Sequence, residues 1–272
     1  MALAKVGSLR LRILSALMLA PLPLVAIWLG GVFLWALTVF AAMIMAWEWG
    51  RLCGGGELRA SGVMLIVGVA VAVAATALAD IRAGAAIALC AAGVVWGMEL
   101  KQESEAPRWM AIGCLWVALP CIILIWLAQS ESAGRITLLW VFAIVWATDI
   151  GAYAVGRLLG GPRLAPHWSP RKTWAGLLGG ICCAALAGWA TARTLGATPV
   201  WPLVLVSAGL AIVEQFGDLA ESVAKRRFGV KDASGLIPGH GGLLDRLDGL
   251  LAVIPAVALL TWVGGGNVLA WR

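Results

Sequence analysis

Long apolar runs, separated by short charged or turn-forming segments, make up most of this chain of 272 residues. The runs predict about nine helices, at residues 13–29, 31–47, 61–79, 82–98, 109–128, 136–157, 173–195, 199–221 and 249–270. A helix that crosses a bilayer needs about 20 predominantly apolar residues, whereas the strands of a membrane β-barrel would alternate polar and apolar residues. The pattern therefore predicts an all-α, polytopic integral membrane protein.

The composition supports this prediction. Charged residues make up 12% of the chain and hydrophobic residues 62%, against about 25% charged residues in a typical soluble domain. The six cysteines lie in or beside apolar runs without CxxC spacing, so we interpret them as small buried residues rather than metal ligands. Several of the tryptophans fall near the ends of the runs, where indole rings anchor at the bilayer interface.

Basic residues are distributed unequally between the two sides of the predicted spans. Alternate sides hold 16 and 4 of the 20 lysines and arginines, and the smaller group consists of Arg82, Arg135, Arg193 and Arg272. Because positively charged loops stay in the cytoplasm, we expect the N-terminus and the charged segment at residues 222–249 on the cytoplasmic side of the plasma (inner) membrane. The first run is expected to remain as an uncleaved helix. This placement accounts for the formal net charge of +6 without a nucleic acid as partner.

The sequence shows neither an internal repeat nor a linker long enough to separate domains. We therefore expect one membrane domain over residues 1–272. Residues 1–135 are expected to be largely scaffold helices, because the clusters of charge follow them. Residues 136–272 are expected to supply the catalytic helices and the cytoplasmic loops.

One predicted span ends in a stripe of polar residues. Its members follow one another at helical spacing and are Glu214, Asp218, Glu221, Ser222 and Lys225. A solvated helix end would explain Lys225 and the arginines after it, but it explains less well the acids one to three turns deeper. Carboxylates inside a membrane are costly and by default face a polar cavity with a partner or an ion. We therefore expect a functional role for Asp218, and leave Glu214 open between a functional and a structural role.

The following segment, "IPGHGGLLDRLDG", combines glycine breaks with a second pair of acids. Asp245 and Asp248 are three residues apart, so they share a face in the first turns of a helix that begins near Leu243. Such a pair can hold one divalent ion or flank two, and the glycine amides before it could approach phosphate oxygens. Solvated helix starts also carry acids, but here lysines and arginines accompany them. Carboxylates beside cations suit Mg²⁺ and polyphosphate together.

A third charged element, "DIGAYAVGR", ends the span predicted at residues 136–157. Asp149 lies inside this span, Tyr153 and Arg157 follow at four-residue steps, and a basic loop that includes Lys172 comes next. A cytoplasmic loop is basic in any case, but a carboxylate inside a span again needs a partner. The two histidines lie too far apart in the sequence to argue for a metal pair, and each is also compatible with an ordinary loop residue.

Together these blocks closely resemble a known family. The pattern S-x-x-K-R-x4-K-D-x-S-x2-I-P-x-H-G-G-x2-D-R-x-D, read from Ser222 to Asp248, is similar to the signature of bacterial phosphatidate cytidylyltransferases, also called CDP-diglyceride synthases. The blocks "DIGAYAVGR", "SPRKTWAG" and "FGDLAES" resemble the family's other motifs, in the same order. Two positions depart from the family pattern. Ala224 stands where a bulky apolar residue is usual, and Ala175 stands where Glu or Gln is usual, which argues against a ligand role at that position.

The resemblance implies that CTP and phosphatidic acid give CDP-diacylglycerol and pyrophosphate, with Mg²⁺ as the cofactor and a homodimer as the assembly. It also implies a metal site in which Asp218 and Asp245 hold Mg²⁺, while Asp248 assists them or holds a second cation. The residues then expected to be catalytic are Asp218, Ser222, Lys225, Arg226, Asp245 and Asp248. The residues then expected to bind the triphosphate or the lipid phosphate are Asp149, Lys172, Lys225, Arg226, Lys231, His240, Gly241, Gly242 and Arg246.

In the reaction that the resemblance implies, the attacking phosphate monoester is already ionised near neutral pH, because its second pKa is about 6. The acids are therefore expected to bind metal rather than to remove a proton.

Two other functions remain open at this point. A CTP-dependent lipid-alcohol kinase of related fold would instead need a base for the hydroxyl group. An ion-coupled transporter would use buried acids as a relay, but these acids cluster at one face and no inverted repeat is visible.

Overall fold

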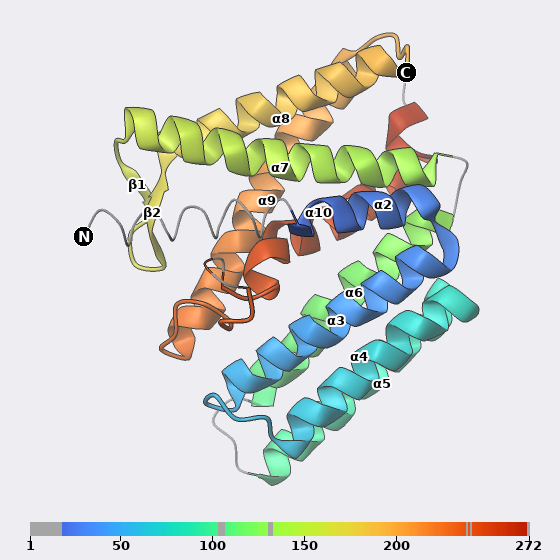
Figure 1. Cartoon of the computed structure of the whole chain (residues 1–272), viewed down its shortest axis with the longest axis vertical. Helices are drawn as coiled ribbons and strands as arrows, with labels where there is room; N and C mark the ends of the chain where they lie inside the picture. The colour runs from blue at the N-terminus through green and yellow to red at the C-terminus, as the bar shows by residue number, and fades with distance from the viewer. Residues whose placement is uncertain (1–17, 103–106, 130–132, 238, 240, 271–272) are drawn as a thin grey trace. The chain divides into compact units, whose positions relative to one another are not determined.

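The computed structural model describes residues 18–102, 107–129, 133–237, 239 and 241–270. Among these residues the chain forms nine α-helices, a two-stranded hairpin and a short 3₁₀-helix (Figure 1). The helices are α2 (Pro21–Leu29), α3 (Gly31–Cys53), α4 (Ala60–Leu78), α5 (Ile81–Lys101), α6 (Pro107–Gln129), α7 (Gly134–Leu159), α8 (Trp174–Thr194), α9 (Trp201–Arg227) and α10 (Leu244–Val263). Eight of them, α3 to α10, are long and apolar enough to cross a membrane. The prediction of an all-α, polytopic membrane protein is confirmed.

The helices extend further into polar sequence than the apolar runs predicted. α3 continues to Cys53 and α9 to Arg227, past the ends predicted at residues 47 and 221. Hydropathy marks where a run stops being apolar, whereas the backbone remains helical until a residue or turn breaks it. The apolar pattern therefore located these helices correctly and placed their ends too early.

The last helix lies at Leu244–Val263, so its start agrees with the helix expected to begin near Leu243. The apolar run predicted at residues 249–270 began later than this helix, because the acids and arginine of "LLDRLDG" are compatible with a helical first turn. The helix ends earlier than that run because three glycines follow it, and the Gly266 amide donates back to the Thr261 carbonyl at 3.1 Å. This hydrogen bond is typical of a helix that a glycine in the left-handed region terminates. The short 3₁₀-helix η1 (Val268–Ala270) follows.

A β-hairpin lies in the segment predicted to be a basic loop. β1 (Arg163–Ala165) pairs antiparallel with β2 (Ser169–Thr173). Strands of this length carry too little alternation for the sequence pattern to reveal them. The hairpin leads directly into α8, and the Thr173 side chain accepts a hydrogen bond from the Gly176 amide at 3.1 Å as a helix cap. Lys172 is thereby held next to the first turn of α8.

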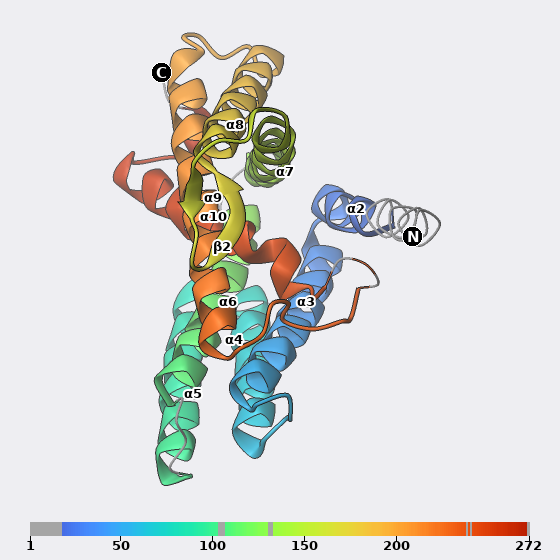
Figure 2. The ribbon, with the colours of Figure 1, turned by 90° about the vertical axis from the view of Figure 1, so that its left-hand side faces the viewer.

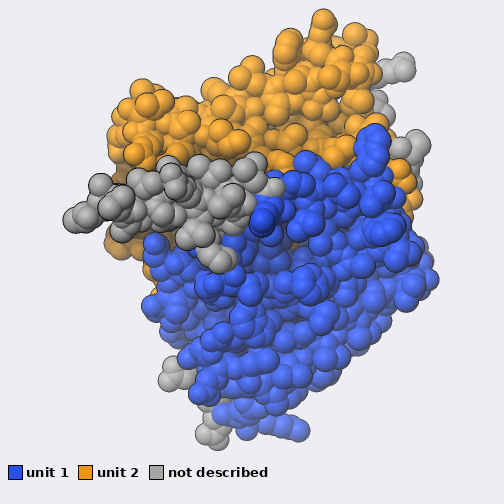
Figure 3. All heavy atoms as spheres, viewed as in Figure 1, with its two compact units in different colours: residues 1–126, 227–247 blue, residues 127–226, 248–272 orange. Residues whose placement is uncertain are grey.

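The chain divides into two compact units, each built from segments far apart in the sequence (Figure 3). Unit 1 contains Met1–Trp126 and Arg227–Leu247, and unit 2 contains Leu127–Arg226 and Asp248–Arg272. α10 contributes its first turn to unit 1 and its remainder to unit 2. The expectation of a single membrane domain whose first 135 residues serve as a scaffold remains a prediction.

Unit 1 is centred on a bundle of α3, α4, α5 and most of α6 (Figures 1 and 2). α3 and α4 approach each other closely at Gly50 and Gly62. A Cβ added to Gly50 would lie only 3.1 Å from the Gly62 Cα. Small residues allow such close approach in a membrane, where helix association depends on packing. Trp49 joins α3 to α6 by donating from Nε1 to the Trp109 carbonyl at 2.8 Å.

In unit 2, α7 and α8 pack along a seam of small residues. The seam consists of Gly151 and Gly156 on α7 and Gly176, Gly179 and Gly180 on α8. At one crossing, a Cβ added to Gly156 would lie 3.3 Å from the Gly176 Cα. This close packing fixes the two helices that flank the β-hairpin, and so determines where Lys172 lies within unit 2.

α9 and α10 also meet at glycines within unit 2. A Cβ on Gly217 would lie 2.6 Å from the Ala252 Cβ and 2.8 Å from the Asp248 carbonyl oxygen. A Cβ on Gly249 would lie 2.6 Å from the Cγ of Glu214. The absence of side chains at these two glycines therefore brings the acids of α9 next to Asp248.

Candidate active site

Asp218 on α9 is held by two neighbours within unit 2. Its Oδ2 lies 2.7 Å from the Lys172 Nζ, and its Oδ1 accepts a hydrogen bond from the Ser222 Oγ at 3.4 Å. The side chains of Lys172 and Asp218 are 17% and 27% exposed, while the Lys172 Nζ itself is buried. The sequence predicted both residues for the site but did not predict that they form an ion pair.

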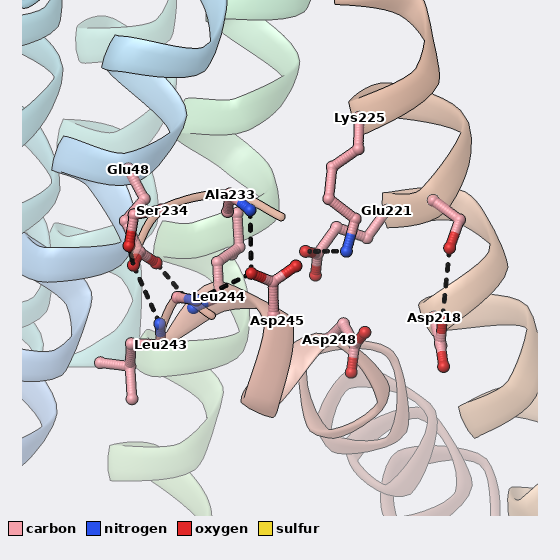
Figure 4. Close-up of polar contacts among 12 residues, drawn as sticks. Glu48, Asp218, Glu221, Lys225, Ala233, Ser234, Leu243, Leu244, Asp245 and Asp248 are labelled. Atoms are coloured by element: carbon pink, nitrogen blue, oxygen red, sulfur yellow. Dashed lines mark hydrogen bonds and ion pairs between the residues drawn. The ribbon is translucent and has the colours of Figure 1, made fainter. Parts of the chain in front are cut away.

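A second ion pair lies further along α9. The Lys225 Nζ is 3.0 Å from the Glu221 Oε1, and both residues are buried (Figure 4). They are four residues apart, the spacing at which oppositely charged side chains meet on one helix face. Lys225 was predicted to bind phosphate, and in this structure its ammonium group is paired with a carboxylate.

Three further acids complete the charged cluster in unit 2. Asp248 on α10 is half-buried and has Glu221, Asp218, Lys225 and Asp149 as electrostatic neighbours. Glu214 on α9 is buried and accepts a hydrogen bond from the Gln215 side chain at 2.7 Å. Its electrostatic neighbours are Asp149, Lys172 and Asp218. Asp149 on α7 is exposed. We call the set Asp149, Lys172, Glu214, Asp218, Glu221, Lys225 and Asp248 the acidic cluster.

The composition of the acidic cluster fits a divalent cation. Five carboxyl groups share it with two ammonium groups, so acidic side chains outnumber basic ones. Mg²⁺ prefers oxygen ligands and takes one or two protein carboxylates together with phosphate oxygens and water. Within the described part of the chain, no three histidine, cysteine or acidic side chains are already arranged as a metal site. The cluster therefore offers suitable ligands for Mg²⁺ without a preformed three-ligand cage.

Asp245 belongs to unit 1, where it organises the start of α10. Its Oδ2 accepts hydrogen bonds from the Gly242 amide and, as Figure 4 shows, from the Ala233 amide, both at 2.8 Å. An acid that reaches back three residues to an amide before the helix is typical of a capping arrangement. One carboxylate oxygen of Asp245 thus supports the backbone, and the role of Asp245 in binding Mg²⁺ stays a prediction.

The glycine amides of this segment already have protein acceptors. The Gly242 amide donates to Asp245, and the Gly241 amide donates to the Ile237 carbonyl at 3.2 Å. Gly241 has a φ of 87°, a left-handed conformation that glycine adopts without strain. These glycines therefore shape the turn into α10, and their predicted contact with substrate stays a prediction.

The remaining predicted residues lie at the surface or outside the described residues. Arg226 is exposed and donates from Nε to the Trp168 carbonyl at 3.3 Å. Lys231 and Arg246 are also exposed. His240 lies outside the described residues. The substrate contacts predicted for these four residues stay predictions.

Glu48 was not predicted as a functional residue, and no role was predicted for Glu221. Glu48 lies on α3 in unit 1 and is wholly buried, with hydrogen bonds to the segment that precedes α10. Its sequence signal is an acid at the end of an apolar run, in "MAWEWG". The rule for carboxylates inside a membrane, applied here to Asp218, would have identified Glu48 as well.

Fold and site together define a class of protein. Eight helices are suited to cross a membrane, and carboxylates and lysines gather on α9, α10 and the elements beside them in unit 2. The chain is therefore a multi-pass membrane protein with a polar, charged site built on its helices.

Comparison with known proteins defines the family. The model of the cytidylyltransferase family matches residues 10–263. A phosphatidate cytidylyltransferase of Brucella suis is 37% identical over 269 residues, which covers 95% of this chain and 94% of that protein. Its counterpart in Pseudomonas aeruginosa is 36% identical over 274 residues, covering 94% of this chain and 98% of the relative. The chain belongs to the cytidylyltransferase family, and the resemblance found in the sequence is confirmed.

Proposed function

We propose that this protein transfers CMP from CTP to phosphatidic acid, giving CDP-diacylglycerol and pyrophosphate for phospholipid biosynthesis. The observation that carries this function is the similarity over nearly the whole chain to proteins named phosphatidate cytidylyltransferase. The same similarity favours this transferase over a lipid-alcohol kinase or an ion-coupled transporter. The helices that bear the acidic cluster also suit a membrane lipid as substrate.

The reaction joins the lipid phosphate to the α-phosphate of CTP and releases pyrophosphate. An oxygen of the lipid phosphate attacks the α-phosphorus of CTP, a new phosphorus–oxygen bond forms, and the bond from the α-phosphorus to the bridging oxygen of pyrophosphate breaks. The attacking oxygen is already ionised near neutral pH, because the second pKa of a phosphate monoester is about 6. The side chains of the acidic cluster therefore have to position the reactants and balance their charge rather than remove a proton.

The lysines of the acidic cluster are suited to hold phosphate oxygens. Lys172 and Lys225 lie 2.7 Å and 3.0 Å from Asp218 and Glu221, so a phosphate group has to compete with a carboxylate for each ammonium group. Charge-assisted hydrogen bonds to phosphate are strong enough to do so. The exposed Arg226 extends the positive charge beyond these two pairs.

The proposed cofactor is Mg²⁺, with Asp218 and Asp245 as the ligands predicted from the sequence motif and Asp248 assisting them or holding a second cation. When bound, Mg²⁺ supplies positive charge against the triphosphate and its leaving group. The carboxylates orient the ion, and the two lysines neutralise the phosphate charge that remains. The acidic excess of the cluster supports this assignment.

Position-specific labelling of CTP tests the function directly. We expect purified protein with phosphatidic acid to transfer label from α-labelled CTP into lipid, and to release label from γ-labelled CTP as pyrophosphate. A lipid-alcohol kinase, when supplied with a lipid alcohol, would instead place the γ-label in the lipid. Label in lipid from the γ-position, or from neither position, would contradict the proposed reaction.

We further propose that the N-terminus and the acidic cluster face the cytoplasm across the plasma (inner) membrane. The excess of lysine and arginine on one side of the predicted spans supports this orientation. A homodimer is proposed from the family resemblance. Crosslinking of the protein in its own membrane would test it, and a crosslinked species of twice the monomer mass is expected.

Single cysteines test the orientation. In a cysteine-free background, we expect Glu57→Cys and Arg171→Cys to react with membrane-impermeant reagents from the cytoplasmic side, since both positions are exposed in loops or strands between spans. Ala79→Cys, exposed between α4 and α5, should react from the opposite side. Labelling of Ala79→Cys and Glu57→Cys from the same side would contradict the order of the spans.

A further inference from the structure

Glu48 connects α3 to a distant segment of the chain within unit 1. Its Oε1 accepts hydrogen bonds from the Ser234 Oγ at 2.6 Å and from the Leu243 amide at 2.9 Å. Its Oε2 accepts from the Leu244 amide at 2.7 Å (Figure 4). The side chain is 0% exposed. One buried carboxylate therefore receives three donors from a segment nearly two hundred residues further along the chain.

These hydrogen bonds satisfy the start of α10. The first amides of a helix have no acceptor within the helix. Here the Gly242 amide donates to Asp245, while the amides of Leu243 and Leu244 donate to Glu48. A negative charge at this position is also favoured by the helix dipole. Two carboxylates, one from α10 and one from α3, thus fix where the first turn of α10 lies in unit 1.

The space around Glu48 explains a glycine of the sequence motif. A Cβ added to Gly242 would collide with the Glu48 carboxylate group. Ser234 is also fixed from both sides, because its Oγ donates to Glu48 and accepts from the Leu236 amide at 3.1 Å. Ser234 and Gly242, both within the motif from Ser222 to Asp248 (the motif segment), therefore meet the same side chain of α3.

We propose that Glu48 is a positioning residue for cytidylyl transfer. It holds the Ser234 side chain and the Leu243 and Leu244 amides at the start of α10, and through them it fixes the backbone around Asp245. Glu48 acts on this segment rather than on a substrate, since its carboxylate oxygens are engaged by the segment's own donors. The proposal rests on the function proposed above, and it assigns a role in the reaction to a helix of the first half of the chain.

The test compares Glu48→Gln with Glu99→Gln. Glu99 is also 0% exposed in unit 1, but it contacts the Ser61 hydroxyl instead of the motif segment. Gln keeps the shape of Glu, yet one of its two acceptors becomes an NH₂ group that faces a donor. Both variants thus lose a buried carboxylate in the same bundle, while Glu48→Gln alone disturbs the start of α10.

Two measurements separate positioning from general stability. We expect Glu48→Gln to speed hydrogen exchange at the Leu243 and Leu244 amides by about tenfold or more, because each loses a charged acceptor. We expect its kcat to fall about tenfold, with KM for CTP and phosphatidic acid changed less than about threefold. Glu99→Gln should leave exchange at these two amides and kcat near the native values.

The outcomes are decisive in either direction. Unchanged exchange at Leu243 and Leu244 in Glu48→Gln would show that Glu48 does not anchor the start of α10. A kcat no lower than that of Glu99→Gln would overturn the role of Glu48 in the reaction. If native protein lacks transferase activity, the proposed function fails, while the exchange result still decides the anchor. Should Glu48→Gln not fold, Ser234→Ala provides the test. It should speed exchange at Leu236 and lower kcat about threefold, and native values for both would overturn the proposal.

Discussion

Asp218→Asn is expected to lower turnover at least about tenfold, or about 1.4 kcal/mol in the activation barrier, while the protein still inserts and purifies. The substitution keeps the shape of the side chain but removes the charge that pairs with Lys172 at 2.7 Å. It also removes one of the carboxylates proposed to bind Mg²⁺, so half-maximal activity should require more Mg²⁺. Turnover of α-labelled CTP over a series of Mg²⁺ concentrations measures both effects.

Asp80→Asn is the matched control, since it makes the same chemical change away from the acidic cluster. Asp80 caps α5 by accepting a hydrogen bond from the Ala83 amide at 2.8 Å, and Asn caps helices about as well as Asp. We expect this variant to keep native turnover and native Mg²⁺ dependence. Retention of more than about a tenth of native turnover by Asp218→Asn would contradict the role assigned to this carboxylate.

Gly217→Ala is expected to lower the free energy of unfolding by about 1–3 kcal/mol, which is typical of overpacking in a close-packed interior. The added Cβ would lie 2.6 Å from the Ala252 Cβ and 2.8 Å from the Asp248 carbonyl oxygen, so α9 and α10 would have to separate. Because Asp248 lies at this crossing, activity should fall together with stability. The melting temperature of purified protein and its turnover measure the two effects.

Gly209→Ala, on the same helix, controls for the change in helix propensity. No atom lies within 4 Å of a Cβ built at Gly209, and the position is exposed. Alanine is favoured over glycine inside a helix by about 0.5–1 kcal/mol, so this variant should be as stable as the native protein or more stable. Equal melting temperatures for Gly209→Ala and Gly217→Ala would show that the close contact between α9 and α10 is absent.

The candidate site shows which contacts the sequence could predict and which contacts depend on the packing of separate elements. Helical spacing placed Asp218, Ser222 and Lys225 on one stripe of α9, and the structure confirms that Ser222 contacts Asp218. Spacing also allowed Glu221 and Lys225 to pair, four residues apart. It could not assign Lys172 to Asp218, because these residues belong to different elements and meet through the packing of α7, α8 and the hairpin. Lys172 was therefore predicted as a phosphate ligand without its partner.

The sequence by itself determined the class of protein, the positions of nearly all helices and the family. Hydropathy and helical periodicity depend on neighbouring residues, and the motif from Ser222 to Asp248 is continuous in the chain. Only the tertiary structure decided that Glu48 supports the start of α10 and that Gly217 and Gly249 bring α9 and α10 into contact. These contacts join residues that are distant in sequence, and a buried acid or a helical glycine looks the same in the sequence whatever it meets. Their roles therefore follow from distances that appear only once the helices are packed.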